Sequence, residues 1–209
     1  SSLMMLFFIS SSIFSHYKKQ AKEHIEQNFS KTGNRDLFQV LANGMVGTVY
    51  SVMYYATGNP IFIVGLAISF ATATADTWAT ELGILSTSRP LSLRALRLVT
   101  PGTSGAISFL GTLFSLLGAM FIAGFCTLEL FLWQTQIGNC TYSQIFWLIA
   151  GAGFSGALLD SLLGATVQAT YFIEEEQKET EKPCHQHRPT RLIRGWRFFN
   201  NDLVNFTSI

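Results

Sequence analysis

The stretch FATATADTWATELG, residues 70–83, begins as an apolar membrane-type helix and ends with two carboxylates, Asp76 and Glu81. An ionisable side chain near the bilayer centre costs roughly 2.5–3.5 kcal/mol on insertion scales, so such residues are usually functional. At about 100° per residue, four polar side chains share an arc of about 140°: Asp76, Thr77, Thr80 and Glu81. The stretch therefore predicts a membrane helix that carries a polar stripe.

Membrane character extends along the whole chain. Of its 209 residues, 48% are hydrophobic and only 13% are charged, about half the charged share of an ordinary soluble domain. All 14 Lys and Arg residues fall into the segments 16–36, 86–104 and 174–202, and the long apolar runs between them contain none. Several runs exceed the roughly 20 residues that a helix needs to cross a hydrocarbon core. The sequence predicts an integral membrane protein, and its net charge of +1 gives no indication of a nucleic-acid partner.

The pattern of apolar runs predicts an all-α polytopic helix bundle that forms a single integral membrane domain over residues 1–209. Four full spans are expected at about 36–57, 60–83, 104–128 and 145–172. Partial helices are expected at 3–15 and from about 199, and both read as parts of longer helices cut off at the ends. By the positive-inside rule, the cytoplasmic loops are expected at about 16–35, 84–103 and 174–197. The membrane would be a bacterial inner membrane or an organelle membrane.

The spans are rich in small residues, which let helices approach closely in lipid. Examples are Gly111, Gly118, Gly151 and Gly156. The segment GAGFSG (151–156) also matches a dinucleotide fingerprint, but that motif requires a strand–turn–helix setting and here lies within a span. The segment CHQH (184–187) offers zinc ligands without a partner cluster. We therefore expect neither motif to bind a cofactor.

Three further polar stripes lie toward the helix ends that are expected to be cytoplasmic. One contains Asp160, Ser161, Gly164 and Gln168, which fall within about 100° of one another. Another contains Asp36, Gln39, Asn43 and Gly47, and the last contains Asn201, Asp202 and Asn205. One stripe alone is as consistent with a packing hydrogen bond as with function. Four stripes at one membrane depth predict a single polar site.

The residue types at this site indicate phosphate chemistry. Carboxylate and amide oxygens are hard ligands that suit Mg²⁺ rather than zinc. Basic residues that could contact phosphate oxygens lie in the neighbouring loops: Lys18, Lys19, Lys22, Arg35, Arg89, Arg94 and Arg97. Thr103 and Ser104 precede an apolar run and form either a helix cap or an anion site. Together these groups indicate phosphoryl or nucleotidyl transfer.

Five ordered segments carry a resemblance to a known membrane family: QVLANG (39–44), ATADTWATELG (73–83), PGTSGAISFLGT (101–112), LLDSLLGATVQ (158–168) and RGWRFFNNDLVN (194–205). Over about residues 17–209 the chain resembles the family called domain of unknown function ninety-two, which includes phytyl-phosphate kinases. The resemblance implies transfer of the γ-phosphate of a nucleoside triphosphate, with CTP as the expected donor, to a phytyl or polyprenyl monophosphate.

The resemblance and the polar stripes together assign expected roles. The expected catalytic residues are Asp76, Glu81, Asp160 and Asp202, and the first three are also the expected Mg²⁺ ligands. The residues expected to bind substrate or phosphate are Lys18, Lys19, Arg35, Gln39, Asn43, Thr77, Thr103, Ser104, Ser161, Gln168, Asn201 and Asn205. The alternative is a membrane transporter or carrier of lipid phosphates or small anions that uses the same stripes as a pathway. The sequence leaves a homo-oligomer open.

Overall fold

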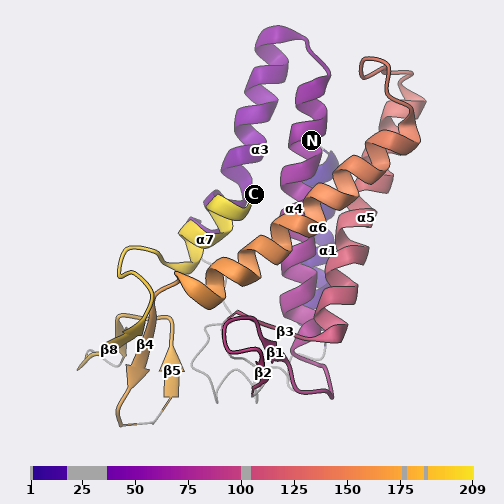
Figure 1. Cartoon of the computed structure of the whole chain (residues 1–209). Helices are drawn as coiled ribbons and strands as arrows, with labels where there is room; N and C mark the ends of the chain where they lie inside the picture. Colours follow the sequence, from indigo (N-terminus) through magenta and orange to yellow (C-terminus); the bar gives the residue numbers. More distant parts are fainter. Residues whose placement is uncertain (1, 18–36, 100–104, 176–177, 186–187) are drawn as a thin grey trace.

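The computed structural model describes residues 2–17, 37–99, 105–175, 178–185 and 188–209, and this part of the chain is mostly helical (Figure 1). The helices are α1 (Ser2–His16), α3 (Leu37–Thr57), α4 (Ile61–Gly83), α5 (Phe109–Leu132), α6 (Tyr142–Thr166) and α7 (Asn201–Ser208). Within the described residues, three helices are long and apolar enough to span a membrane: α4, α5 and α6. The fourth expected span forms α3, which is 21 residues long but more polar, because it carries the Gln39 and Asn43 amides.

The loops between the helices contain short strands that the sequence pattern did not predict. In the loop between α4 and α5, β1 (Leu91–Ser92) pairs with β2 (Arg97–Leu98) and β3 (Ala106–Ile107). In the segment between α6 and α7, β4 (Thr170–Ile173) pairs with β5 (Lys178–Thr180) and β8 (Arg191–Arg194). In the same segment, β6 (Cys184–His185) pairs with β7 (Arg188–Pro189). All of these pairings are antiparallel.

Two of these strands correct the expected limits of spans. The span expected to begin at residue 104 begins at Phe109, because Ala106–Ile107 pairs with β1 and the Ser108 side chain accepts a hydrogen bond from the Gly111 backbone N–H as the helix cap. The span expected to reach residue 172 ends at Thr166. The segment that follows, Thr170–Ile173, is rich in β-branched and aromatic residues, which suit a strand, and it pairs with β5 and β8.

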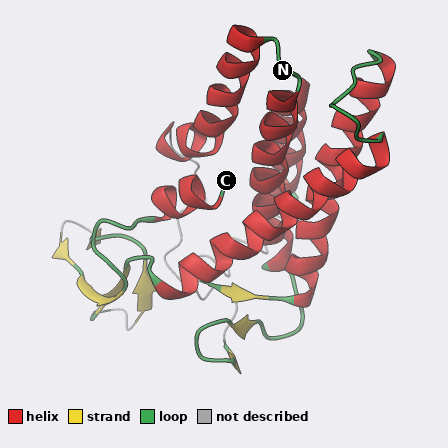
Figure 2. Ribbon diagram, turned by 45° about the horizontal axis from the view of Figure 1, so that its top comes forward, coloured by secondary structure: helices red, strands yellow, loops and turns green. Residues whose placement is uncertain are grey.

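The loops that contain strands lie at one end of the bundle, and the loops without strands lie at the other. Figures 1 and 2 show the strands near one end, whereas the 58–60 turn and the 133–141 loop lie at the other. Among the described residues, every Lys and Arg lies between positions 89 and 197, in the strand-containing loops or in the segment just before α7. The alternation of charge along the sequence therefore corresponds to a separation in space.

Helix α4 is the centre of the bundle and contacts α1, α3, α5 and α6. Small residues allow this close packing. A Cβ atom built at Gly118 of α5 would lie 3.1 Å from the Thr74 carbonyl oxygen, and one at Gly153 of α6 would lie 2.6 Å from the Ala71 Cβ. The expected small-residue packing is confirmed for Gly111, Gly118 and Gly156 but not for Gly151, where a Cβ atom would have no neighbour within 4 Å. Close packing explains why α4 buries an alanine- and threonine-rich stretch over residues 71–75.

Candidate functional site

Helices α4, α6 and α7 meet at Gly156. A Cβ atom at this position would lie 2.6 Å from the Thr72 Cγ2 of α4 and 2.8 Å from the Ser208 carbonyl oxygen of α7. No side chain fits between these three helices, so Gly156 brings the backbone of α6 against both neighbours. The candidate site lies next to this crossing.

Asp76 and Asp160 each lie one helical turn beyond this crossing. Asp76 follows Thr72 by four residues, and Asp160 follows Gly156 by four. Helices α4 and α6 run in the same direction, toward the end of the bundle where the strands lie (Figure 1). Four residues turn a helix by about 40° beyond one full turn, so each carboxylate lies close to the face that makes the crossing contact. Asp76 and Asp160 therefore each lie one turn past the α4–α6 contact, on the side of the crossing that is nearer the strands.

Helix α7 holds Asp160 in place. The Ser208 hydroxyl donates a hydrogen bond to Asp160 Oδ2 at 3.0 Å. Two features anchor α7 itself: the Asn200 side chain caps it by accepting from the Leu203 N–H at 3.0 Å, and Val204 is fully buried. Of the residues in the predicted stripe on α7, Asn205 is buried, and Asn201 and Asp202, in the first turn, are half-buried.

Glu81 faces a different neighbour from Asp76. Nine residues separate Thr72 from Glu81, which places Glu81 about 180° around α4 from the crossing face. There it accepts a hydrogen bond from the Ser15 hydroxyl of α1 at 2.6 Å. Glu81 thus contacts α1, and the expectation that Asp76, Glu81 and Asp160 are the Mg²⁺ ligands stays a prediction. Among the described residues, no group of three or more His, Cys, Asp and Glu side chains is placed to hold a metal ion.

Packing against α1 explains this orientation. The rings of Phe14 and Trp78 make an edge contact at 4.8 Å between centroids, and Trp78 Nε1 donates to the Ser10 hydroxyl at 3.4 Å. These contacts turn one side of α4 toward α1, and Glu81 lies on that side. Thr77 is buried on α4 as well, and it lies about 140° from Thr72.

The polar stripe of α6 continues beyond Asp160 to an arginine. Gly164 is buried on this stripe, with Ser161 half-buried beside it, and Gln168, two residues beyond the end of α6, is buried as well. The Arg194 guanidinium of β8 donates to the Thr170 hydroxyl at 2.8 Å and to the Gly164 carbonyl at 3.5 Å. Arg194 belongs to none of the predicted polar stripes or phosphate-binding groups, although it is the first residue of the segment RGWRFFNNDLVN.

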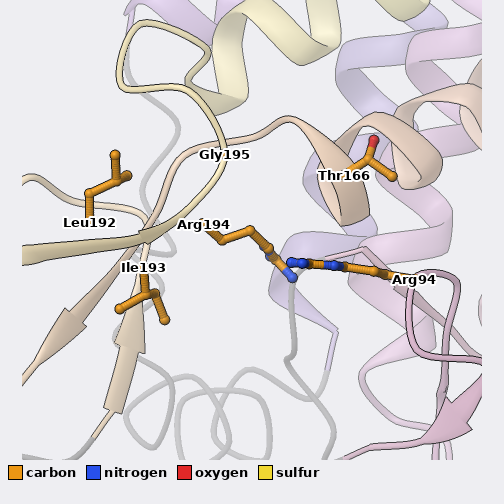
Figure 3. A pocket seen from close by; sticks show the side chains of 6 residues that line it. All are labelled: Arg94, Thr166, Leu192, Ile193, Arg194 and Gly195. Atoms are coloured by element: carbon orange, nitrogen blue, oxygen red, sulfur yellow. The ribbon is translucent and has the colours of Figure 1, made fainter.

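A pocket of about 390 Å³ opens beside Arg194 at the end of α6. Figure 3 shows its lining residues: Arg94, Thr166, Leu192, Ile193, Arg194 and Gly195. The pKa of Arg194 is lowered from its usual value, first by burial and then by the charge of Arg94, while Glu179 and Glu181 act in the opposite direction. The two arginines are thus close enough to repel each other.

Several predicted residues fall outside the described part of the chain. These are Lys18, Lys19, Arg35, Thr103 and Ser104. Gln39 and Asn43 belong to α3, whose backbone is described at these positions while their side chains are not. The roles assigned to these residues stay predictions.

The long apolar helices, with polar groups gathered toward one end, define an integral membrane protein. Comparison with known proteins gives its family: the chain belongs to the family described as Integral membrane protein DUF92, which matches residues 1–209. This finding confirms the family resemblance inferred from the five sequence segments.

Three relatives show how far the similarity extends. Protein PGR of Arabidopsis thaliana is 29% identical over 99% of this chain and 76% of its own length. Uncharacterized membrane protein MJ0933 of Methanocaldococcus jannaschii is 33% identical over 83% of this chain and 67% of its own length. Protein VTE6, chloroplastic, of Arabidopsis thaliana is 26% identical over 92% of this chain, which spans about half (49%) of that protein. No solved structure matches the chain.

Proposed function

We propose that this protein is a Mg²⁺-dependent prenyl-phosphate kinase of the membrane. It transfers the γ-phosphate of a nucleoside triphosphate, with CTP as the expected donor, to a phytyl or polyprenyl monophosphate and forms the diphosphate. The site faces the cytoplasm, because the basic loops lie at the same end of the bundle as the polar stripes. The lipid tail lies between the helices, and its phosphate lies at the level of Asp76 and Asp160.

One observation carries this proposal: Asp76 and Asp160 each lie one turn beyond the α4–α6 crossing, and the Ser208 hydroxyl donates a hydrogen bond to Asp160 at 3.0 Å. Such a costly placement of carboxylates in a membrane protein indicates function. The family resemblance, to a family that includes phytyl-phosphate kinases, supplies the reaction. The basic end of the bundle supplies cations for an anionic substrate.

The chemistry fits the residues present. An oxygen of the prenyl phosphate attacks the γ-phosphorus of the donor, the bond from that phosphorus to the bridging oxygen breaks, and the nucleoside diphosphate leaves. The attacking phosphate is already ionised at neutral pH, so no strong general base is needed. Asp76 and Asp160 would hold Mg²⁺, which neutralises charge on the transferring phosphate. Two carboxylates suffice because Mg²⁺ commonly takes its other ligands from water and substrate phosphates.

The competing proposal, a carrier of lipid phosphates or small anions, would need polar groups accessible from both membrane faces. Asp76, Asp160 and Asp202 all lie toward the strand-containing end of the bundle. Toward the opposite end, α5 carries Glu129, which accepts a hydrogen bond from the Ser2 hydroxyl at 2.5 Å. The polar groups are therefore concentrated on one side, which favours an enzyme.

A phosphoryl-transfer assay on the purified full-length protein in lipid tests this function. We expect γ-labelled CTP or ATP with Mg²⁺ and geranylgeranyl monophosphate to yield labelled prenyl diphosphate. Asp76→Asn and Asp160→Asn should each lower kcat by 100-fold or more, roughly the loss when charge stabilisation is removed from a transition state. Glu129→Gln is the matched control, because it removes a membrane carboxylate at the other end, and it should keep turnover. Absence of transfer with every nucleotide and chain length, in folded protein, would favour the carrier.

A further inference from the structure

Two cationic side chains from distant parts of the sequence converge on the pocket at the end of α6. Arg94 lies between β1 and β2, and Arg194 is the last residue of β8, yet both line the pocket and their guanidinium groups point toward each other (Figure 3). Thr166, the last residue of α6, adds a hydroxyl to the lining. We propose that Arg94 and Arg194 form a binding site for the polyphosphate of the nucleotide donor. The assignment to the donor, though not the anion site itself, rests on the proposed kinase function.

Arg194 is held in position before any ligand binds. Its Nε and Nη2 atoms both donate to the Thr170 hydroxyl, at 3.2 and 2.8 Å, and Thr170 is only 2% exposed. The following residue, Gly195, has a φ of +74°, and a Cβ atom there would lie 2.0 Å from the Gln168 carbonyl oxygen. Only glycine permits this approach. Because the backbone and one edge of the guanidinium are fixed, little conformational entropy is lost when the remaining N–H groups bind an anion.

The two pocket arginines make no ion pair with any described residue. Among the described residues, the ion pairs join Arg188 to Glu175 and Arg191 to Glu174, and neither pocket arginine takes part in one. Glu179 and Glu181 attract Arg194 without an ion pair to it, and the attraction of Glu179 is larger than the repulsion by Arg94. Two neighbouring guanidinium groups repel each other, and an anion between them converts this repulsion into two attractive contacts. Arginine also matches phosphate oxygens through paired N–H donors.

The position of the pocket favours the donor nucleotide over the lipid headgroup. The pocket lies beyond the last turn of α6, among strands and loops, rather than between the apolar helices. The carbonyl that Arg194 contacts belongs to Gly164, one turn, or about 6 Å, along α6 from Asp160. A chain of phosphates that starts in the pocket can therefore extend along the α6 stripe toward the carboxylates. A prenyl monophosphate has one phosphate, and its tail would hold it at the membrane level of Asp76 and Asp160.

Binding of inorganic tripolyphosphate to the full-length protein, in nanodiscs of a zwitterionic lipid, tests the site by calorimetry. We expect Arg94→Gln to weaken binding by about 10-fold to 100-fold, the range for loss of a charged hydrogen-bonding partner. Arg94 is exposed, so this variant should keep its fold. Arg194→Lys retains the charge but loses the paired donors, and it should also bind more weakly. Arg191→Gln is the matched control on the same strand, because Arg191 lies outside the pocket. Equal binding by Arg94→Gln and wild type would overturn the proposal.

Transfer kinetics distinguish the donor from the lipid phosphate. In the Arg94→Gln variant we expect the KM for CTP to rise about 10-fold or more, while the KM for geranylgeranyl monophosphate stays within about two-fold of wild type. A rise confined to the KM of the lipid would overturn the assignment to the donor. If no nucleotide supports transfer but tripolyphosphate binding still depends on Arg94, the anion site is supported and the kinase proposal fails.

Discussion

The substitution Gly156→Ala tests whether the α4–α6–α7 crossing sets the geometry of the candidate site. The added Cβ would lie 2.6 Å from Thr72 Cγ2, 2.7 Å from Thr72 Oγ1 and 2.8 Å from the Ser208 carbonyl oxygen. Ordinary carbon contacts are about 3.5–4.0 Å, so α6 must move from its neighbours by about 1 Å. Overpacking of this kind lowers the free energy of unfolding by about 1–3 kcal/mol. A displacement of about 1 Å between reacting groups can lower turnover by about 100-fold.

Thermal unfolding in detergent and the γ-phosphate transfer assay measure the two effects. Alanine is the better helix former by about 1 kcal/mol, so a loss of stability in Gly156→Ala would identify the contact rather than helix propensity as the cause. Gly151→Ala is the matched control on the same helix, because a Cβ atom at Gly151 has no neighbour within 4 Å. It should be at least as stable as wild type and fully active. Unchanged stability and turnover in Gly156→Ala would refute the idea that this crossing positions Asp160.

Two further predictions concern the edges of the site. Ser15→Ala and Glu81→Ala each remove one partner of the 2.6 Å hydrogen bond between these side chains. In a double-mutant cycle of unfolding free energies the two substitutions should be coupled by about 0.5–3 kcal/mol, and additive effects would show that Glu81 does not depend on α1. Gly195→Ala places a Cβ atom 2.0 Å from the Gln168 carbonyl oxygen at a φ of +74°. The substitution should lower the free energy of unfolding by about 1–3 kcal/mol and increase proteolysis between residues 170 and 200. Unchanged proteolysis would show that β8 does not need this contact.

The sequence alone determined the features that depend on neighbouring residues. Long apolar runs and clustered basic residues predicted a membrane bundle with two unlike ends, because hydrophobicity and charge are local properties. Helical periodicity placed polar residues on one stripe of each helix, including Asp160 and Gly164 on α6, whereas Gln168 lies two residues beyond the end of that helix. Local pattern was less reliable at the ends of the spans. There, Ala106–Ile107 and Thr170–Ile173 leave the helices because they pair with strands elsewhere in the loops.

Only the tertiary structure decided which stripes meet. The 140° arc from Asp76 to Glu81 was visible in the sequence, but only the structure shows that Glu81 contacts α1, whereas Thr72, one turn before Asp76, packs against α6. Ser208 meets Asp160 across 48 residues of sequence, and Arg194 meets Arg94 across the whole of α5 and α6. Such contacts depend on how glycines let helices cross and on how strands close the loops, so no local periodicity encodes them.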